Sequence, residues 1–146
     1  YVICLEVNKK DFIFFREKDM YSVTEKELVK SLDDFKEANI ILIDLNDVDD
    51  VMASSICSDV VYLVEPSILG INKVFMLDQD SFDKLKDFKV VLNDCLLNER
   101  DVSRFAREAG IKVFYTLPPL NDRIDNSKIL LPFLEKLELY KKIDGN

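Results

Sequence analysis

The sequence predicts an α/β fold in which a mostly parallel, twisted sheet carries helices on both faces. Short apolar runs at residues 40–44, 60–65, 90–93 and 113–118 alternate with segments whose apolar residues have helical spacing, a pattern typical of βαβ units. Each run ends on a polar or turn residue, as strands do at the ligand-binding edge of an open α/β sheet. With 146 residues, 48% of them apolar, we expect a single domain over residues 1–146.

The amino-terminal part begins with a predicted strand. Residues 1–7 are rich in β-forming side chains, and a second short apolar run follows at 12–16. Thr24 and Glu27 have the spacing of a capping box, and apolar residues with helical spacing follow them. We therefore predict a helix over residues 24–37.

The middle of the chain alternates strand and helix signals. The apolar run at 40–45 predicts a strand, and a short helix is expected at 51–57. The next strand is predicted at 59–65. Ser67 follows it directly and is suited to cap a long helix, because its hydroxyl can accept a free backbone N–H of the first turn.

The carboxyl-terminal part repeats the same order of elements. Residues 89–93 predict a strand, and 99–108 form an amphipathic pattern that ends before Gly110, a favoured C-cap residue. The last strand is predicted at 111–115. A final helix is predicted at 128–142 from its spaced leucines.

Composition excludes several classes of function. The net charge is −8, from 20 basic and 28 acidic residues, so we expect no direct contact with nucleic acid, which requires a clustered basic face. The chain has no histidine, which excludes Ser-His and Cys-His nucleophiles and histidine-ligated metals. Cys4, Cys57 and Cys95 lie far apart, and we interpret them as buried reduced thiols.

No membrane segment is predicted. No apolar run approaches the roughly 20 residues of a membrane-spanning helix, and the amino end carries Glu6, Lys9, Lys10 and Asp11 where a signal peptide is apolar. We expect a cytoplasmic protein without a membrane span.

Asp44 is the strongest candidate for a role in chemistry. It ends an apolar strand, and Asn46, Asp47, Asp49 and Asp50 follow it, which together offer many oxygen ligands. A carboxylate at such a strand end can orient a Mg²⁺-bound water beside a nucleotide phosphate. The alternative is a solvated loop whose acidic residues complement a helix amino end, and sequence alone favours this alternative.

Asn93 and the Pro118-Pro119 pair also follow strands. The Asn93 side chain could recognise the edge of a base, or it could form an Asx turn. Pro118 and Pro119 could form a rigid wall against a flat ligand, or they could only end the strand. Both interpretations remain open for each position.

The order of these segments resembles that of the MinD/ParA-like deviant-Walker P-loop ATPases, especially the CpaE-like, pilus-assembly branch. The matching residues are Ile41-Leu42-Ile43-Asp44-Leu45, the strand and helix start at 58–67, Lys89-Val90-Val91-Leu92-Asn93, and 113–118 with its proline turn. The resemblance covers roughly residues 39–140. It implies a P-loop NTPase-like fold, incomplete or degenerate in this chain.

The resemblance also implies roles for individual residues. Asp44 corresponds to the Walker-B-like aspartate and metal position, and Asn93 to the asparagine that recognises adenine, with Pro118 and Pro119 beside the base. Members of the family dimerise around ATP and position cellular cargo such as chromosomes, septa, flagella or pili. A homodimer and other protein partners are therefore expected.

The phosphate-binding loop of this family is missing from residues 1–146. The chain has only Gly70, Gly110 and Gly145, and none belongs to a glycine-rich loop with a signature lysine. No cofactor is therefore expected for this chain, and ATP with Mg²⁺ only if a P-loop lies upstream. Tyr1 is not an initiator Met, so we expect the domain to lack its amino-terminal P-loop strand and helix.

Two placements of residues 1–7 remain open. If they are the family's second strand, the central first strand lies upstream and the sheet has a gap. If they occupy the central position instead, the loop at 8–11 replaces the P-loop, and the protein is a nucleotide-free pseudo-ATPase. Since parallel strands need paired edges and covered faces, we expect a missing central strand to be compensated by another chain or by a rearrangement.

The expected function is that of a truncated or degenerate ATPase-fold domain that acts through protein contacts in intracellular positioning or in pilus or secretion assembly. We expect no ATP hydrolysis from this chain alone. The alternative is a receiver-like regulatory module with an acidic phosphoacceptor pocket at Asp44. Against this alternative, no early Asp pair follows the first strand, and residues 113–120 lack the expected late lysine.

Overall fold

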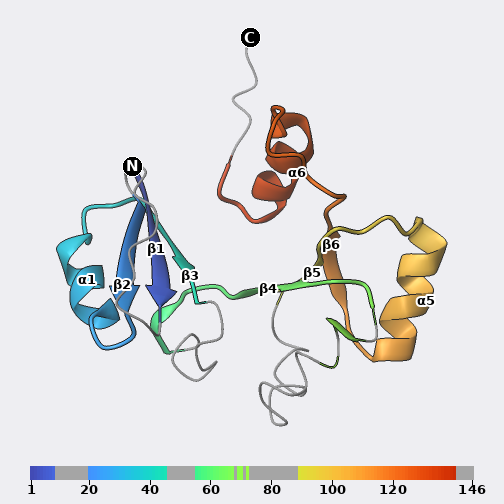
Figure 1. The fold of residues 1–146 in the computed structure, drawn as a ribbon, viewed down its shortest axis with the longest axis horizontal. Helices are drawn as coiled ribbons and strands as arrows, with labels where there is room; N and C mark the ends of the chain where they lie inside the picture. Colours follow the sequence, from blue (N-terminus) through green and yellow to red (C-terminus); the bar gives the residue numbers. More distant parts are fainter. Residues whose placement is uncertain (9–19, 46–54, 68, 71, 73–88, 141–146) are drawn as a thin grey trace. The chain divides into compact units, whose positions relative to one another are not determined.

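The computed structural model describes residues 1–8, 20–45, 55–67, 69–70, 72 and 89–140. They belong to two compact units, residues 1–56 and 57–146. Each unit contains one three-stranded parallel sheet (Figure 1). The predicted α/β class with parallel strands is confirmed, but the strands lie in two sheets where the sequence suggested one.

The sheet of the first unit has the order β2-β1-β3. Its strands are β1 (Val2–Asn8), β2 (Met20–Thr24) and β3 (Ile40–Asp44). In the parallel register Cys4 lies opposite Met20 on one side and Leu42 on the other. The predicted strands at 1–7 and 40–45 are confirmed, whereas β2 was not predicted.

The core of the first unit forms between one face of this sheet and α1 (Leu28–Asp34). Alternate residues of β1 supply its centre, because successive side chains of a strand point to opposite faces. The buried members are Ile3, Leu5, Val7, Val23 and Leu28, and Ile41, Ile43, Leu32 and Phe35 pack against them. Full burial of one such aliphatic side chain contributes about 1.5–3 kcal/mol.

A turn built on Thr24 and Glu27 leads into α1. The Thr24 N–H and hydroxyl both donate to the Glu27 carboxylate, at 3.2 and 2.8 Å. These bonds lower the pKa of Glu27, since they favour its charged form. The predicted pair therefore forms, but the helix begins at Leu28, after the turn, and ends at Asp34 rather than at residue 37.

The sheet of the second unit has the order β4-β5-β6, with β4 (Val61–Val64), β5 (Lys89–Leu92) and β6 (Val113–Thr116). The central strand β5 is buried on both faces. Val90 packs with Val64 in one cluster, and Val91 packs with Leu117 and Phe133 in another. The predicted strands at 59–65, 89–93 and 111–115 are confirmed, with bounds shifted by one or two residues.

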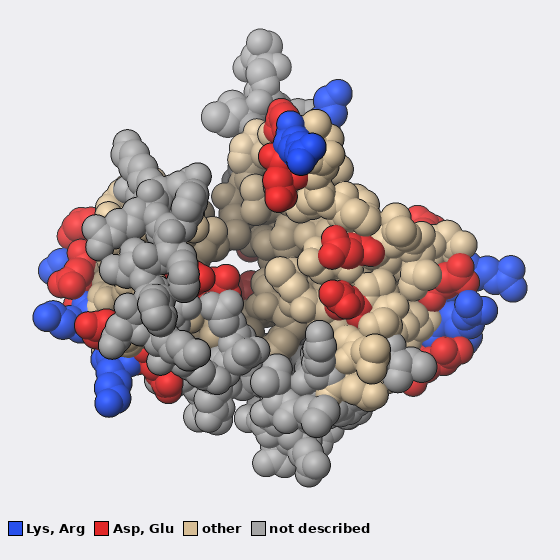
Figure 2. Space-filling model, in the orientation of Figure 1, with Lys and Arg blue, Asp and Glu red and all other residues tan. Residues whose placement is uncertain are grey.

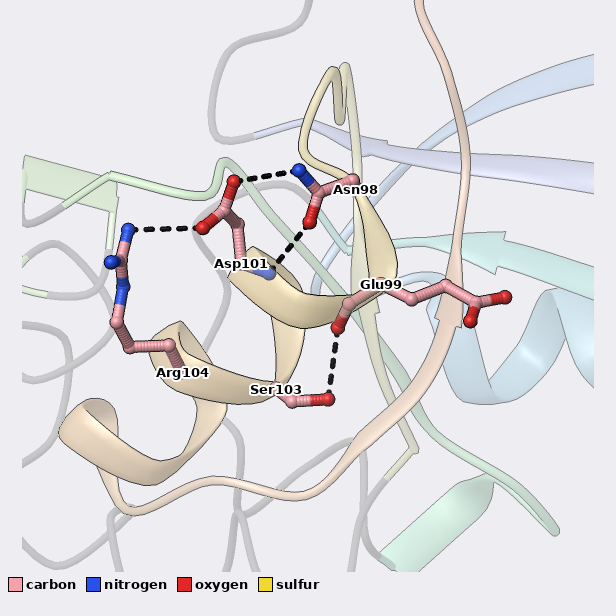
Figure 3. Close-up of polar contacts among 5 residues, drawn as sticks. All are labelled: Asn98, Glu99, Asp101, Ser103 and Arg104. Carbon is pink, nitrogen blue, oxygen red and sulfur yellow. Dashed lines mark hydrogen bonds and ion pairs between the residues drawn. The ribbon is translucent and has the colours of Figure 1, made fainter.

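The helix α5 (Glu99–Ala109) agrees with the predicted helix at 99–108. The Asn98 side chain accepts the Asp101 N–H at 2.9 Å and donates to the Asp101 carboxylate at 2.9 Å (Figure 3). Gly110 ends the helix with a φ of 67°, a left-handed conformation that glycine adopts without strain. The residue types at the two ends of α5, Asn98 and Gly110, therefore determine where the helix begins and ends.

The helix α6 (Ser127–Lys136) is shorter than the predicted helix at 128–142. Glu138 has a φ of 61°, and the Leu139 N–H turns back to the Leu134 carbonyl at 3.0 Å. This pairing is typical of a Schellman-type helix end, in which a left-handed residue follows the last turn. The prediction of continued helix to residue 142 was therefore wrong at 137–140.

The predicted cap at Ser67 is confirmed, because its Oγ accepts the Gly70 N–H at 2.9 Å. The apolar run at 12–16 and most of the predicted helices at 51–57 and after Ser67 lie outside the described residues. No helix among the described residues is long and apolar enough to cross a membrane.

Candidate functional site

The candidate site lies at the carboxyl end of the β4-β5-β6 sheet. Asn93 follows β5 directly, and its N–H donates to the Val64 carbonyl at 2.9 Å. Leu117 follows β6, and its N–H donates to the Leu92 carbonyl at 2.8 Å. These two bonds continue the ladder past the strands, so that Asn93 and Pro118 lie on neighbouring strand ends.

The half-buried Asn93 side chain is not used in a local turn. An Asx turn would require the Asn93 side chain to accept the N–H of Cys95. That N–H instead donates to the Leu117 carbonyl at 2.8 Å, which joins the loop after β5 to the end of β6. Among the described residues nothing forms a hydrogen bond with the Asn93 side-chain amide, which carries both donors and an acceptor.

Asp94 allows the chain to make this connection. Its φ of 51° lies in the left-handed region, which Asp and Asn tolerate better than other non-glycine residues. The left-handed conformation reverses the chain after β5 and brings Cys95, which is buried, against the end of β6. The backbone at Asn93 is therefore fixed from both sides.

Pro118 and Pro119 are exposed and follow a buried anchor. The preceding Leu117 is 4% exposed and packs with Val91 and Phe133. Since proline has no N–H, the pair cannot extend the ladder, and β6 ends before it. A rigid, exposed apolar surface next to Asn93 is compatible with contact to a flat ligand and with simple strand termination.

The turn after β4 also belongs to this edge of the sheet. The sequence alone did not predict a role for Gly70 in this turn. A Cβ atom at Gly70 would overlap with the carbonyl oxygen of Glu65, which also accepts the Ser67 N–H at 2.7 Å. Only glycine allows the helix start to approach the strand end this closely. The sequence signal that could have indicated this role is the position of the glycine, three residues after the capping Ser67.

Asp44 belongs to the sheet of the first unit. It is the exposed last residue of β3 and lies opposite Glu6 of β1 in the parallel register. Asn46, Asp47, Asp49 and Asp50, which the metal hypothesis also requires, lie outside the described residues. Within the described ranges, no group of three acidic or cysteine side chains is suitable to hold a metal ion.

Two titratable groups with shifted pKa values have structural causes. The Ser127 hydroxyl and N–H lower the pKa of Asp125 at the start of α6. Partial burial raises the pKa of the half-buried Cys57 thiol, because burial disfavours the charged thiolate. Neither group indicates acid-base or nucleophilic catalysis.

The sequence matches no protein-family model, no curated protein and no solved structure.

Proposed function

We propose that residues 1–146 form a MinD/ParA-like, CpaE-like ATPase-fold domain, truncated or degenerate, that acts through protein contacts in intracellular positioning or in pilus or secretion assembly. The observation that carries this proposal is the placement of Asn93 and Pro118 on neighbouring strand ends, with a side-chain amide that no local turn uses. In a MinD/ParA-like fold, this edge of the sheet lies beside the base of the bound nucleotide.

The strand order supports the placement of β1 as the family's second strand. In that placement a central strand is missing and the sheet has a gap. The strand β3 is an edge of one three-stranded sheet and β4 is an edge of the other. We propose that β3 and β4 each pair in parallel with a strand from outside residues 1–146.

The composition of the two edges fits this addition. The strands β3 and β4 contain only aliphatic residues apart from Tyr62 and the terminal Asp44, and neither carries the lysine, proline or bulge that protects a free edge. The opposite edge strand, β6, is different. There the Lys136 ammonium donates to the Phe114 carbonyl at 2.7 Å, and a bulge interrupts its pairing with β5.

The backbone of β4 offers specific groups to the added strand. The Val60 and Val64 carbonyls accept the Lys89 and Asn93 N–H groups. Because the groups of a parallel strand alternate between its two sides, those of Val61 and Leu63 point away from β5. The Leu63 side chain is also 62% exposed, as expected for a strand that has no second neighbour among the described strands.

Asp44 and Asn93 have separate roles in the proposed fold. Asp44 would hold the Mg²⁺-bound water, and Asn93 would bind adenine beside Pro118 and Pro119. Phosphate binding requires a glycine-rich loop with lysine, and no such loop occurs in residues 1–146. This chain alone is therefore expected to bind no ATP and to catalyse no hydrolysis.

Partners are proposed to be proteins, with a homodimer among them, rather than nucleic acid. On the face drawn in Figure 2, the described Lys and Arg residues are interspersed with Asp and Glu and form no broad basic patch. The net charge of −8 also opposes binding to phosphate backbones.

Calorimetric titration with Mg²⁺-ATP tests the nucleotide part of the proposal. Residues 1–146 should give no binding heat, whereas the protein with a glycine-rich loop and lysine upstream should bind. In the longer protein Asn93→Ala should weaken binding by about tenfold or more, since a buried base contact loses its partner at a cost of about 1–3 kcal/mol. The matched control is Asn98→Ala, which alters a helix cap on the same loop.

Micromolar binding of ATP by residues 1–146 would contradict the proposed absence of phosphate-binding machinery.

The receiver-like alternative predicts a different result, phosphorylation of Asp44. Acetyl phosphate should then add the mass of one phosphoryl group at Asp44, and Asp44→Asn should prevent it. An unchanged mass is the outcome that the ATPase-fold proposal predicts.

A further inference from the structure

We draw no further inference here: the strongest candidate, the surface patch of exposed apolar side chains in the loops at the carboxyl end of the β4-β5-β6 sheet, Leu96 and Ile124 among them, adjoins the site already described, and nothing in the described residues shows what covers it.

Discussion

The two sheets differ in how many of their faces are buried. In the first unit, Ile3 of β1 is 0% exposed, whereas the preceding Val2 is 42% exposed. In the second unit, Val90 and Val91 of β5 are 1% and 0% exposed although they point to opposite faces. Parallel sheets are normally covered on both faces. The central strand of the second sheet is covered in this way, whereas the described part of the first sheet is covered only on the side of α1.

Core truncations should give the largest effects and should reveal this difference. Ile3→Ala should lower the free energy of unfolding by about 2–5 kcal/mol, and Val2→Ala by less than about 0.5 kcal/mol. In the second unit, Val90→Ala and Val91→Ala should each cost about 1.5–3 kcal/mol. Urea unfolding of the four variants, followed by circular dichroism, measures these values.

A different pattern would break the comparison. If Val2→Ala costs as much as Ile3→Ala, the second face of the β2-β1-β3 sheet is covered in solution. If only one of Val90→Ala and Val91→Ala is destabilising, the second sheet is not closed on both faces.

The turn after β4 should give the next largest effect. Gly70→Ala should cost about 1–3 kcal/mol, because its new methyl group would push the helix start away from the Glu65 carbonyl. Glu108→Ala, on the exposed side of α5, is the matched control and should change stability by less than about 0.5 kcal/mol. If the Gly70→Ala variant is as stable as the native protein, Gly70 does not lie as close to the Glu65 carbonyl as the structure indicates.

Helix capping should give a smaller effect and again separates the two units. Asn98→Ala should lower the free energy of unfolding by about 1 kcal/mol, because the Asp101 N–H loses its acceptor. The helix α1 has no side-chain cap at its first turn, and Glu27→Ala should cost less than Asn98→Ala. Thermal unfolding of both variants makes the comparison, and a larger loss for Glu27→Ala would contradict it.

Most strands could be predicted from the sequence, because burial on one or both faces produces continuous or alternating apolar runs. The exception is β2, a five-residue strand in which Ser22 and Thr24 interrupt the apolar residues. Its signal was hidden by the capping pattern that starts at Thr24. The tertiary pairing of Cys4 with Met20, which no local pattern shows, fixes this strand.

The candidate site could be predicted only in outline. Asn93 and Pro118 follow apolar runs, and the rule that parallel strands end at one edge brings them together. The bond from Cys95 to Leu117 and the contact of Gly70 with Glu65 depend on distant backbone segments that meet only in the folded chain. The early end of α6 has a different, local cause, since Glu138 takes a positive φ that its residue type does not favour.

The central claim is that β3 and β4 are edges that receive a strand from outside residues 1–146, and amide hydrogen exchange at β4 tests it most directly. In residues 1–146 the Leu63 N–H, which points away from β5, should exchange quickly, while the Val64 N–H should be protected by its bond to β5. In the protein extended upstream, both should be protected. Equal protection of the Leu63 N–H in the two proteins, or rapid exchange in both, would contradict the claim.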